Sequence, residues 1–288
     1  MKETYNFKHL FLLCFFLIFS GVLSAQTISN VTYEYSCPCR ITVTYELAYC
    51  GDVVLYYSPD TTVRWMVADT FRGKTPGTYT DVWNCEADGV NYGLLYFKLK
   101  WVNKCPPDAV QINCVCWATR NVDAPYTFAA NPTDAGMLYQ WDYSIGWSST
   151  NPMTSFPAGN TWGGTNSSSI SWTSGTDPSP VGFRVPDTTQ MNKLLDTSAV
   201  TIEWVTLPDG VKGCYFTDKI NKNSIFLPAA GYRNYLGGTL DNVGLTGYYW
   251  SSTPLSANAA YNLLFKSDTA YLYNGYKRFG FFIRPVAE

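Results

Sequence analysis

Short runs of alternating hydrophobic and polar residues dominate the first third of the chain. Residues 40–47 (RITVTYEL) alternate almost strictly, as the residues of a strand with one buried face do. Further short apolar or aromatic runs, separated by turn residues, cover residues 53–57, 63–67, 79–83 and 94–102. No window in this part repeats its apolar residues with the period of a helix. We therefore predict a β-sandwich over residues 26–107.

The pattern changes after Cys105-Pro106-Pro107, where two prolines end the last strand and stiffen the connection. We place a domain boundary near Pro107. Residues 111–121 (QINCVCWATRN) are typical of an opening strand. Residues 129–181 are polar, aromatic and rich in glycine and serine, without a helical pattern. So long a loop region in a compact domain is usually functional or held by disulfides.

One helix start is evident in the second half of the chain. Asp187 and Gln190 have the spacing of a capping box, in which two side chains satisfy free backbone N–H groups. Apolar residues follow at helical spacing, so we predict a helix that ends at about Ser198. Short strands are expected over residues 200–204 and 213–217.

Three apolar blocks close the chain, each about one strand and one loop from the next. They are FLPAAGYRN (226–234), GYYWSST (247–253) and FGFFIRPVAE (279–288). This spacing predicts a β-meander around a shared core. The fold class expected is therefore mainly β, with an α+β second domain over residues 108–288.

The first residues have the pattern of a secretory signal. Lys2 and Lys8 flank the start of an apolar run over residues 10–19, and small residues lead up to Ala25. The run is too short to span a bilayer, so we expect a cleaved signal peptide over residues 1–25 rather than an uncleaved anchor. No later stretch is long and apolar enough for a transmembrane segment.

Eight cysteines would remain in the mature chain, and an even number in an oxidising compartment predicts disulfides. The disulfide candidates are Cys37, Cys39, Cys50, Cys85, Cys105, Cys114, Cys116 and Cys214. A bond inside either Cys-x-Cys pair would be strained, so each member should pair elsewhere. A four-cysteine zinc site and a redox pair are alternatives, but the spacing of two intervening residues that both favour is missing.

Charge and histidine content exclude several function classes. Charged residues make up 15% of the chain and the net charge is −2, so no basic excess exists to bind nucleic acid. His9, the only histidine, leaves with the signal peptide, which excludes histidine-based nucleophilic catalysis and histidine-ligated metals. We therefore expect no enzyme activity, no cofactor and no metal. The 22 tyrosines favour strands and binding surfaces.

The sandwich region carries the string WNCEADGVNYGLLYFKLK over residues 83–100. It resembles the immunoglobulin- or fibronectin-like sandwiches that precede another module in secreted Bacteroidetes proteins. The resemblance implies a fold and names no ligand.

The second half also resembles a known family. Six blocks occur in one order: CWATRNV, GMLYQW, DPSPVGFRVPDTTQMNKLL, FLPAAGYRN, GYYWSST and FIRPV. The series resembles the Fibrobacter succinogenes major paralogous domain, a family of secreted bacterial modules. That family is similar to the C-type-lectin-like fold of formylglycine-generating sulfatase-modifying proteins. The resemblance implies a small mixed sheet, one or two helices and long loops. It also implies secretion to the periplasm or cell surface of a Gram-negative bacterium.

This chain departs from the family pattern at two cysteines. Ser179 stands where the pattern has a cysteine before GFRVP, and no cysteine follows Arg284 near the end. The paired losses imply a deleted disulfide. Cys214 would then bond Cys114 or Cys116, or remain buried and free.

The function that these observations favour is non-catalytic binding or adhesion, with a glycan or a protein as partner. One alternative is an oxidoreductase of the formylglycine-generating type, which would need a late cysteine pair that this chain lacks. A second alternative is a structural subunit of a surface appendage. Calcium-dependent sugar binding is not favoured, because the E-P-N and W-N-D strings of lectins are absent from the second domain.

Trp147, Trp162 and Trp172 are the candidate ligand-binding residues, because exposed rings among small polar residues can stack on sugars. The alternative is that these rings hold the loop region together. Trp141 and Trp250 lie in family blocks and are expected to be structural.

Three arginines, Arg184, Arg233 and Arg284, lie in motif blocks and could bind a carboxylate ligand. We prefer a structural role, in which they bridge strands to buried carbonyl groups or to Asp187.

Overall fold

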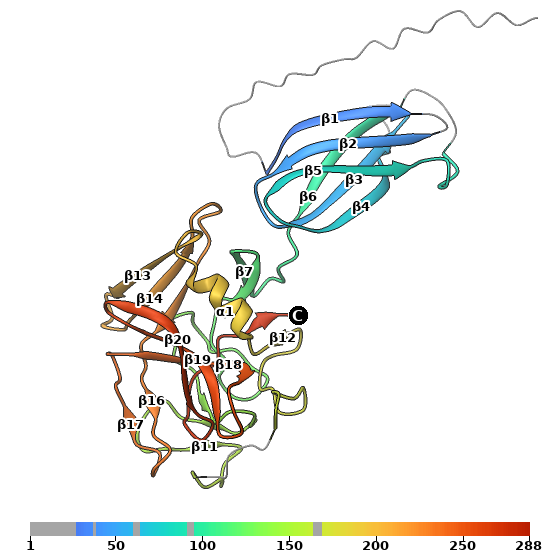
Figure 1. Ribbon diagram of the computed structural model, residues 1–288. Helices are drawn as coiled ribbons and strands as arrows, with labels where there is room; N and C mark the ends of the chain where they lie inside the picture. The colour runs from blue at the N-terminus through green and yellow to red at the C-terminus, as the bar shows by residue number, and fades with distance from the viewer. Residues whose placement is uncertain (1–26, 37–38, 60–63, 91–94, 164–168) are drawn as a thin grey trace, which may run out of the picture.

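The structure is a computed structural model that describes residues 27–36, 39–59, 64–90, 95–163 and 169–288. The protein is mainly β, with one α-helix among the described residues (Figure 1). None of the described helical segments has the length and apolarity needed to cross a membrane. The predicted signal peptide lies outside the described residues.

The first six strands form two antiparallel three-stranded sheets that pack face to face (Figure 1). One sheet has the order β1 (Ile28–Ser36), β2 (Arg40–Leu47), β5 (Gly77–Asn84). The other has the order β4 (Met66–Lys74), β3 (Gly51–Ser58), β6 (Tyr96–Val102). Their shared core is built from the alternating residues that point inward, including Val43, Tyr45, Val53 and Leu55. We call this part the sandwich.

The predicted strands of the sandwich are confirmed except for the third. The predicted run over residues 63–67 overlaps β4 only at Met66 and Val67. The observed strand continues to Lys74 and includes several polar residues. Polar residues are tolerated here because β4 lies at a sheet edge and buries only Phe71. Hydropathy marks such an edge strand poorly.

Disulfides tie the sandwich to itself and to the chain that follows. Cys39 pairs with Cys85 inside the sandwich. Cys50 pairs with Cys114, and Cys105 pairs with Cys116. As expected, none of the described cysteines bonds within its own Cys-x-Cys pair. Cys37 lies outside the described residues.

The segment expected to form one opening strand over residues 111–121 is instead a hairpin of β7 (Ala109–Ile112) and β8 (Val115–Ala118). Asn113 and Cys114 form its turn with positive φ angles of 43° and 65°. The turn brings Cys114 to Cys50. A disulfide therefore accounts for a reversal that hydropathy does not mark.

Residues 109–288, which we call the C-terminal unit, contain several small sheets. The larger ones have the orders β12-β21-β8-β7, β13-β14-β15 and β18-β19-β20. Their further strands are β12 (Phe183–Arg184), β13 (Val200–Thr206), β14 (Lys212–Asp218), β15 (Ser224–Pro228), β18 (Gly247–Pro254), β19 (Ala259–Lys266), β20 (Thr269–Tyr276) and β21 (Val286–Ala287). Two-residue strands complete the unit: β9 (Leu138–Tyr139), β10 (Gly146–Trp147), β11 (Ser155–Phe156), β16 (Tyr232–Arg233) and β17 (Leu240–Asp241).

Helix α1 (Thr188–Leu195) begins with the predicted capping box. The Asp187 carboxylate accepts the N–H of Gln190, and the Gln190 side chain accepts the N–H of Asp187. The helix ends before the predicted Ser198, because Asp196 is extended and its carboxylate accepts from Ser198. Its apolar face, with Met191 buried, belongs to the main core.

The three closing blocks share a core, but they do not form the predicted meander. The meander is β18-β19-β20, so a hairpin separates the second block from the third. The second and third blocks instead meet in a parallel bridge between Tyr249 and Phe282. The N–H of Trp250 donates to the Phe282 carbonyl at 2.9 Å. Tyr249, Phe282 and Leu227 of the first block all pack in one core.

Candidate functional site

The three candidate tryptophans hold loops in place rather than forming one site. Trp147 is 3% exposed and meets Trp162 edge to face, with 5.0 Å between ring centroids. Trp172 lies in a different cluster, where it packs edge to face on Trp141 and donates from Nε1 to the Thr176 carbonyl. Trp147 therefore offers no ring face to a sugar in this conformation, and the three rings do not converge.

The structural role expected of Trp141, Trp250, Arg233 and Arg284 is confirmed. Trp141 and Trp250 are fully buried, and their indole N–H groups donate to backbone carbonyls at 2.8 and 2.7 Å. Arg233 and Arg284 are also buried and donate to carbonyl or amide oxygens. Arg184 lies 4.0 Å from the Asp187 carboxylate.

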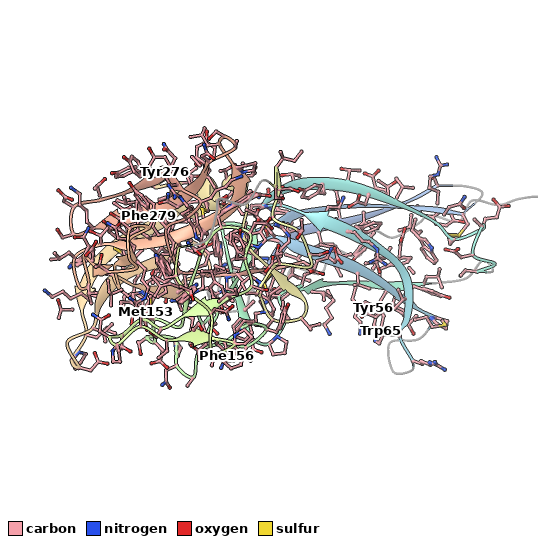
Figure 2. All side chains as sticks on the ribbon, turned by 90° about the horizontal axis from the view of Figure 1, so that it is seen from below. Tyr56, Trp65, Met153, Phe156, Tyr276 and Phe279 are labelled. Carbon is pink, nitrogen blue, oxygen red and sulfur yellow. A yellow bond between two sulfur atoms is a disulfide. The ribbon has the colours of Figure 1, made fainter. Side chains whose placement is uncertain are left out.

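A surface of aromatic side chains lies over the sheet β18-β19-β20 and the hairpin β16-β17. We call it the tyrosine face. Its members are Tyr232, Tyr235, Tyr248, Tyr271, Tyr273, Tyr276 and Phe279. Tyr271, Tyr273 and Tyr276 are 40%, 49% and 52% exposed, and the other members are half-buried. In Figure 2, Tyr276 and Phe279 lie together on the surface of the C-terminal unit.

Five rings of the tyrosine face touch in a continuous series, and Tyr271 and Tyr273 form a separate pair with ring centroids 6.0 Å apart. Tyr235 meets Tyr276 and Phe279 at 5.6 and 5.1 Å, and Phe279 meets Tyr232 at 5.4 Å. Tyr232 meets Tyr248 at 4.9 Å. Most of these contacts are edge to face, the geometry that aromatic quadrupoles favour. Each ring therefore limits the rotation of its neighbour.

A buried aromatic layer supports the face from below. Phe281 is buried and stacks on Tyr248 and Phe279, with centroids 5.0 and 5.6 Å apart. Gly275 leaves room for Phe281, since a Cβ at this position would lie 3.0 Å from that ring. The exposed Tyr276 ring stacks on Phe279 above this layer and is thus pre-organised, which lowers the entropy lost when a ligand binds.

The electrostatics of the face favour hydrogen bonding from neutral hydroxyl groups. The pKa of Tyr248 is raised, mainly by burial and further by the nearby hydroxyls of Tyr232, Tyr271 and Tyr273. The pKa of Tyr232 is also raised by burial, so the hydroxyls of Tyr248 and Tyr232 are protonated at neutral pH and can both donate and accept. Arg278 places its guanidinium 5.0 Å from the Tyr235 ring centroid and forms no ion pair with a described residue.

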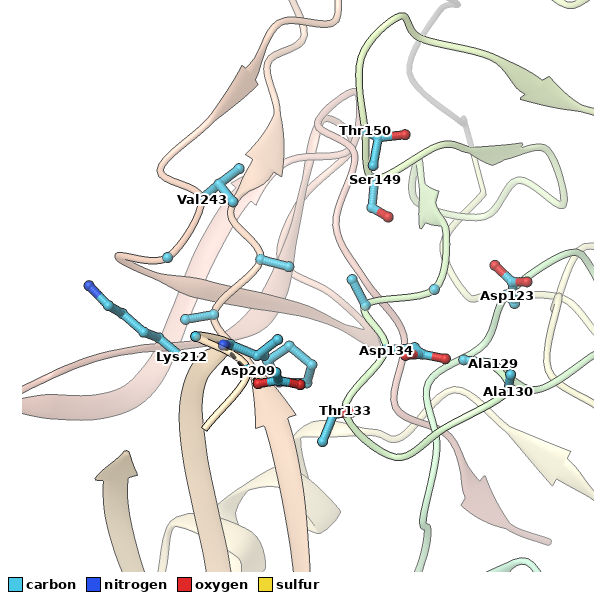
Figure 3. A pocket seen from close by; sticks show the side chains of 18 residues that line it. Asp123, Ala129, Ala130, Thr133, Asp134, Ser149, Thr150, Asp209, Lys212 and Val243 are labelled. Carbon is cyan, nitrogen blue, oxygen red and sulfur yellow. Dashed lines mark hydrogen bonds between the residues drawn. The ribbon is translucent and has the colours of Figure 1, made fainter. Parts of the chain in front are cut away.

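A cleft of about 710 Å³ lies elsewhere in the C-terminal unit (Figure 3). Asp209 and Lys212 lie on one wall, and Asp123 and Asp134 lie on the other. Most of the remaining lining residues are small, and none is aromatic. The carboxylates of Asp134 and Asp209 already accept N–H groups of their own turns at 2.8 and 3.1 Å. The cleft therefore has charged residues on two walls but lacks a stacking surface.

Neither metal chemistry nor thiol chemistry has a built site in the described part of the chain. No three histidine, cysteine, aspartate or glutamate residues cluster there closely enough to hold a metal ion. Cys214 is free and buried on β14, and burial raises the pKa of its thiol to about 12. The two cysteines considered as its partners are bonded elsewhere. The thiol is therefore protonated and unreactive at neutral pH.

The tyrosine face was not among the sites predicted from the sequence. The available signal was the string TAYLYNGY at residues 269–276, in which tyrosines recur at every second residue before becoming irregular. Tyr271 and Tyr273 share one side of an edge strand, and small or polar residues surround them. The other members come from separate segments, which only the fold brings together.

Comparison with known proteins gives one partial match. A family model described as a domain of unknown function (DUF8237) matches residues 189–286, from helix α1 to β21. No curated protein and no solved structure matches the chain. The matched segment contains every member of the tyrosine face.

Proposed function

We propose that the protein is a non-catalytic recognition protein of the secreted or cell-surface class and that it binds a glycan through the tyrosine face. The observation that carries the proposal is the series of five touching rings, with the exposed pair Tyr271 and Tyr273 beside it. Aromatic rings stack on the apolar faces of sugars, and their hydroxyls meet the hydroxyls of the sugar. A C-type-lectin-like module is consistent with this role.

The ligand class that fits best is an acidic glycan, with a carboxylate or sulfate group. Arg278 is partly buried beside the face, with its guanidinium 5.0 Å from the centroid of the Tyr235 ring. The ring orients the planar guanidinium, whose terminal N–H groups can bind an anion, while its Nε is buried without a hydrogen-bond partner. The disulfides support an extracellular setting, since such bonds persist in oxidising compartments.

Two observations favour binding over the oxidoreductase alternative. The formylglycine-generating type of chemistry needs a reactive cysteine pair, whereas Cys214 is single, buried and protonated at neutral pH. The members of the tyrosine face also include no cysteine, histidine, lysine or carboxylate side chain that could act as a nucleophile, acid or base.

The proposal can be tested on an array of neutral and acidic glycans with residues 26–288. We expect binding that Tyr273→Ala and Tyr276→Ala each weaken about tenfold, the loss expected for one stacked ring. Tyr126→Ala is the matched control, because Tyr126 is an exposed tyrosine outside the face. Arg278→Gln should reduce binding to acidic glycans more than to neutral ones. Binding that survives all three changes on the face would rule out this surface.

A further inference from the structure

One lateral side of the sandwich is open. Tyr33 and Tyr35 of β1 lie opposite Val43 and Ile41 of β2, so each pair points to the same inner face of the sheet. Val43 and Ile41 are 0% and 2% exposed, whereas Tyr33 and Tyr35 are 37% and 45% exposed. Inner-face residues on the middle strand are therefore buried, whereas those on β1 are partly exposed.

Strand β6, at the same side of the second sheet, also has inner-face residues that are only partly buried. Phe97 and Leu99 of β6 pair with Tyr57 and Leu55 of β3, and these residues point toward the core. Leu55 is fully buried, whereas the inner residues of β6 are only partly buried. Tyr33 stacks on Phe97 with centroids 5.3 Å apart, and this contact bridges the two sheets at the open side.

The opposite lateral side is closed. A short turn joins β4 directly to β5, so the chain itself crosses between the sheets there. Lys74 forms an ion pair with Asp81 at 2.7 Å and lies over the Tyr79 ring at 4.4 Å. The asymmetry places the missing element next to β1 and β6.

Strand β6 also has a free backbone edge. It pairs with β3 on one side, and no described strand pairs with it on the other. Its seven residues would span about 23 Å as an extended strand. A free edge of this length next to half-exposed apolar residues is a template for one more strand.

The outer face of β6 is basic. Lys98 and Lys100 point away from the core and alternate with the inner residues Phe97, Leu99 and Trp101. The Lys98 ammonium lies 4.2 Å from the centroid of the Trp65 ring, on the outside of the sheet. A strand added beside β6 would carry its outward side chains next to these lysines.

We propose that β6 accepts an extended segment of a partner polypeptide in which apolar residues alternate with acidic ones. The apolar side chains pack against the exposed sides of Tyr33 and Phe97 and extend the core. The acidic side chains lie beside Lys98 and Lys100. The sandwich thus serves assembly with another chain, independently of glycan binding by the C-terminal unit.

The test uses residues 26–288 with disulfides intact and two seven-residue peptides, one alternating valine with glutamate and one alternating valine with lysine. We expect the glutamate peptide to bind and to protect β6 amides from hydrogen exchange. The lysine peptide should bind about tenfold more weakly, since two surface charge pairs are involved. The charge reversal Lys98→Glu with Lys100→Glu should invert this preference, whereas Val82→Glu on β5 should leave it unchanged.

Three outcomes would overturn the proposal. They are failure of both peptides to bind, protection confined to strands other than β6, and equal binding of the two peptides. Sedimentation without peptide provides a further check. Self-association that protects β6 amides would assign the edge to a second copy of this chain and not to an acidic partner segment.

Discussion

Replacing Arg284 with methionine tests whether a buried guanidinium holds the C-terminal unit together. The side chain is fully buried and has no carboxylate partner among the described residues. It donates to the Asn121 side chain at 2.7 Å and to the carbonyls of Ala118 and Phe226 at 3.2 and 2.8 Å. These acceptors belong to three separate segments, so one side chain joins β8, the loop after it and β15.

The magnitude follows from two opposing effects. Three buried acceptors without a donor would cost about 1–3 kcal/mol each, or about 6 kcal/mol in total. Burial lowers the pKa of Arg284 to about 10. That desolvation costs about 3 kcal/mol, which methionine would avoid. The lost hydrogen bonds outweigh the relieved desolvation, and we expect Arg284→Met to lower the free energy of unfolding by about 3 kcal/mol.

Urea unfolding at pH 7, followed by tryptophan fluorescence with disulfides intact, measures this change. Arg184→Met is the matched control, because Arg184 is partly exposed and its Asp187 partner is 4.0 Å away. We expect the control to change the free energy of unfolding by less than about 1 kcal/mol. Equal effects of the two substitutions would refute the reasoning.

Two further predictions concern titratable groups. Burial acts to raise the pKa of Asp52, but hydrogen bonds from Lys104 and Gly73 outweigh it, so the folded-state pKa is lowered. Asp52 therefore stabilises the fold above its unfolded pKa, and this stabilisation is lost as the pH falls through the folded pKa. Thermal unfolding at pH 7 and pH 2.5 tests this. The decrease in melting temperature between the two pH values should be smaller for Asp52→Asn than for wild type. Cys214 should resist a thiol reagent at pH 8 in the folded protein and react in urea, and the urea-dependent signal should fall by one equivalent in Cys214→Ser.

Elements that depend on local sequence were predictable. Strand β2 alternates because one face is buried, and its predicted bounds are those observed. The capping box of α1 needs only Asp187 and Gln190, two residues within one helical turn. Both features arise from interactions between residues close in sequence, so hydropathy and spacing contain the necessary information.

Pairing between distant segments was not predictable in the same way. The parallel bridge between Tyr249 and Phe282 crosses an intervening hairpin, and no local pattern marks it. The burial of Trp147 was missed for a related reason. The glycine next to Trp147 suggested an exposed loop. In the structure Gly146 instead allows close packing, because a Cβ there would lie 2.6 Å from the Met137 sulfur. Small residues beside large rings can indicate close packing as well as exposure.

The block GYYWSST shows how scaffold and binding surface share one strand. Tyr249 and Trp250 on β18 are buried in two different cores, because successive residues point to opposite faces. Tyr248 shares its side of the sheet with Trp250 but lies farther out, where it contacts Tyr232 of the tyrosine face. A change at Trp250 would therefore shift Phe281, whose ring lies 4.2 Å away and also stacks on Tyr248. The strand expected to be scaffold alone thus sets the position of the rings proposed to bind ligand.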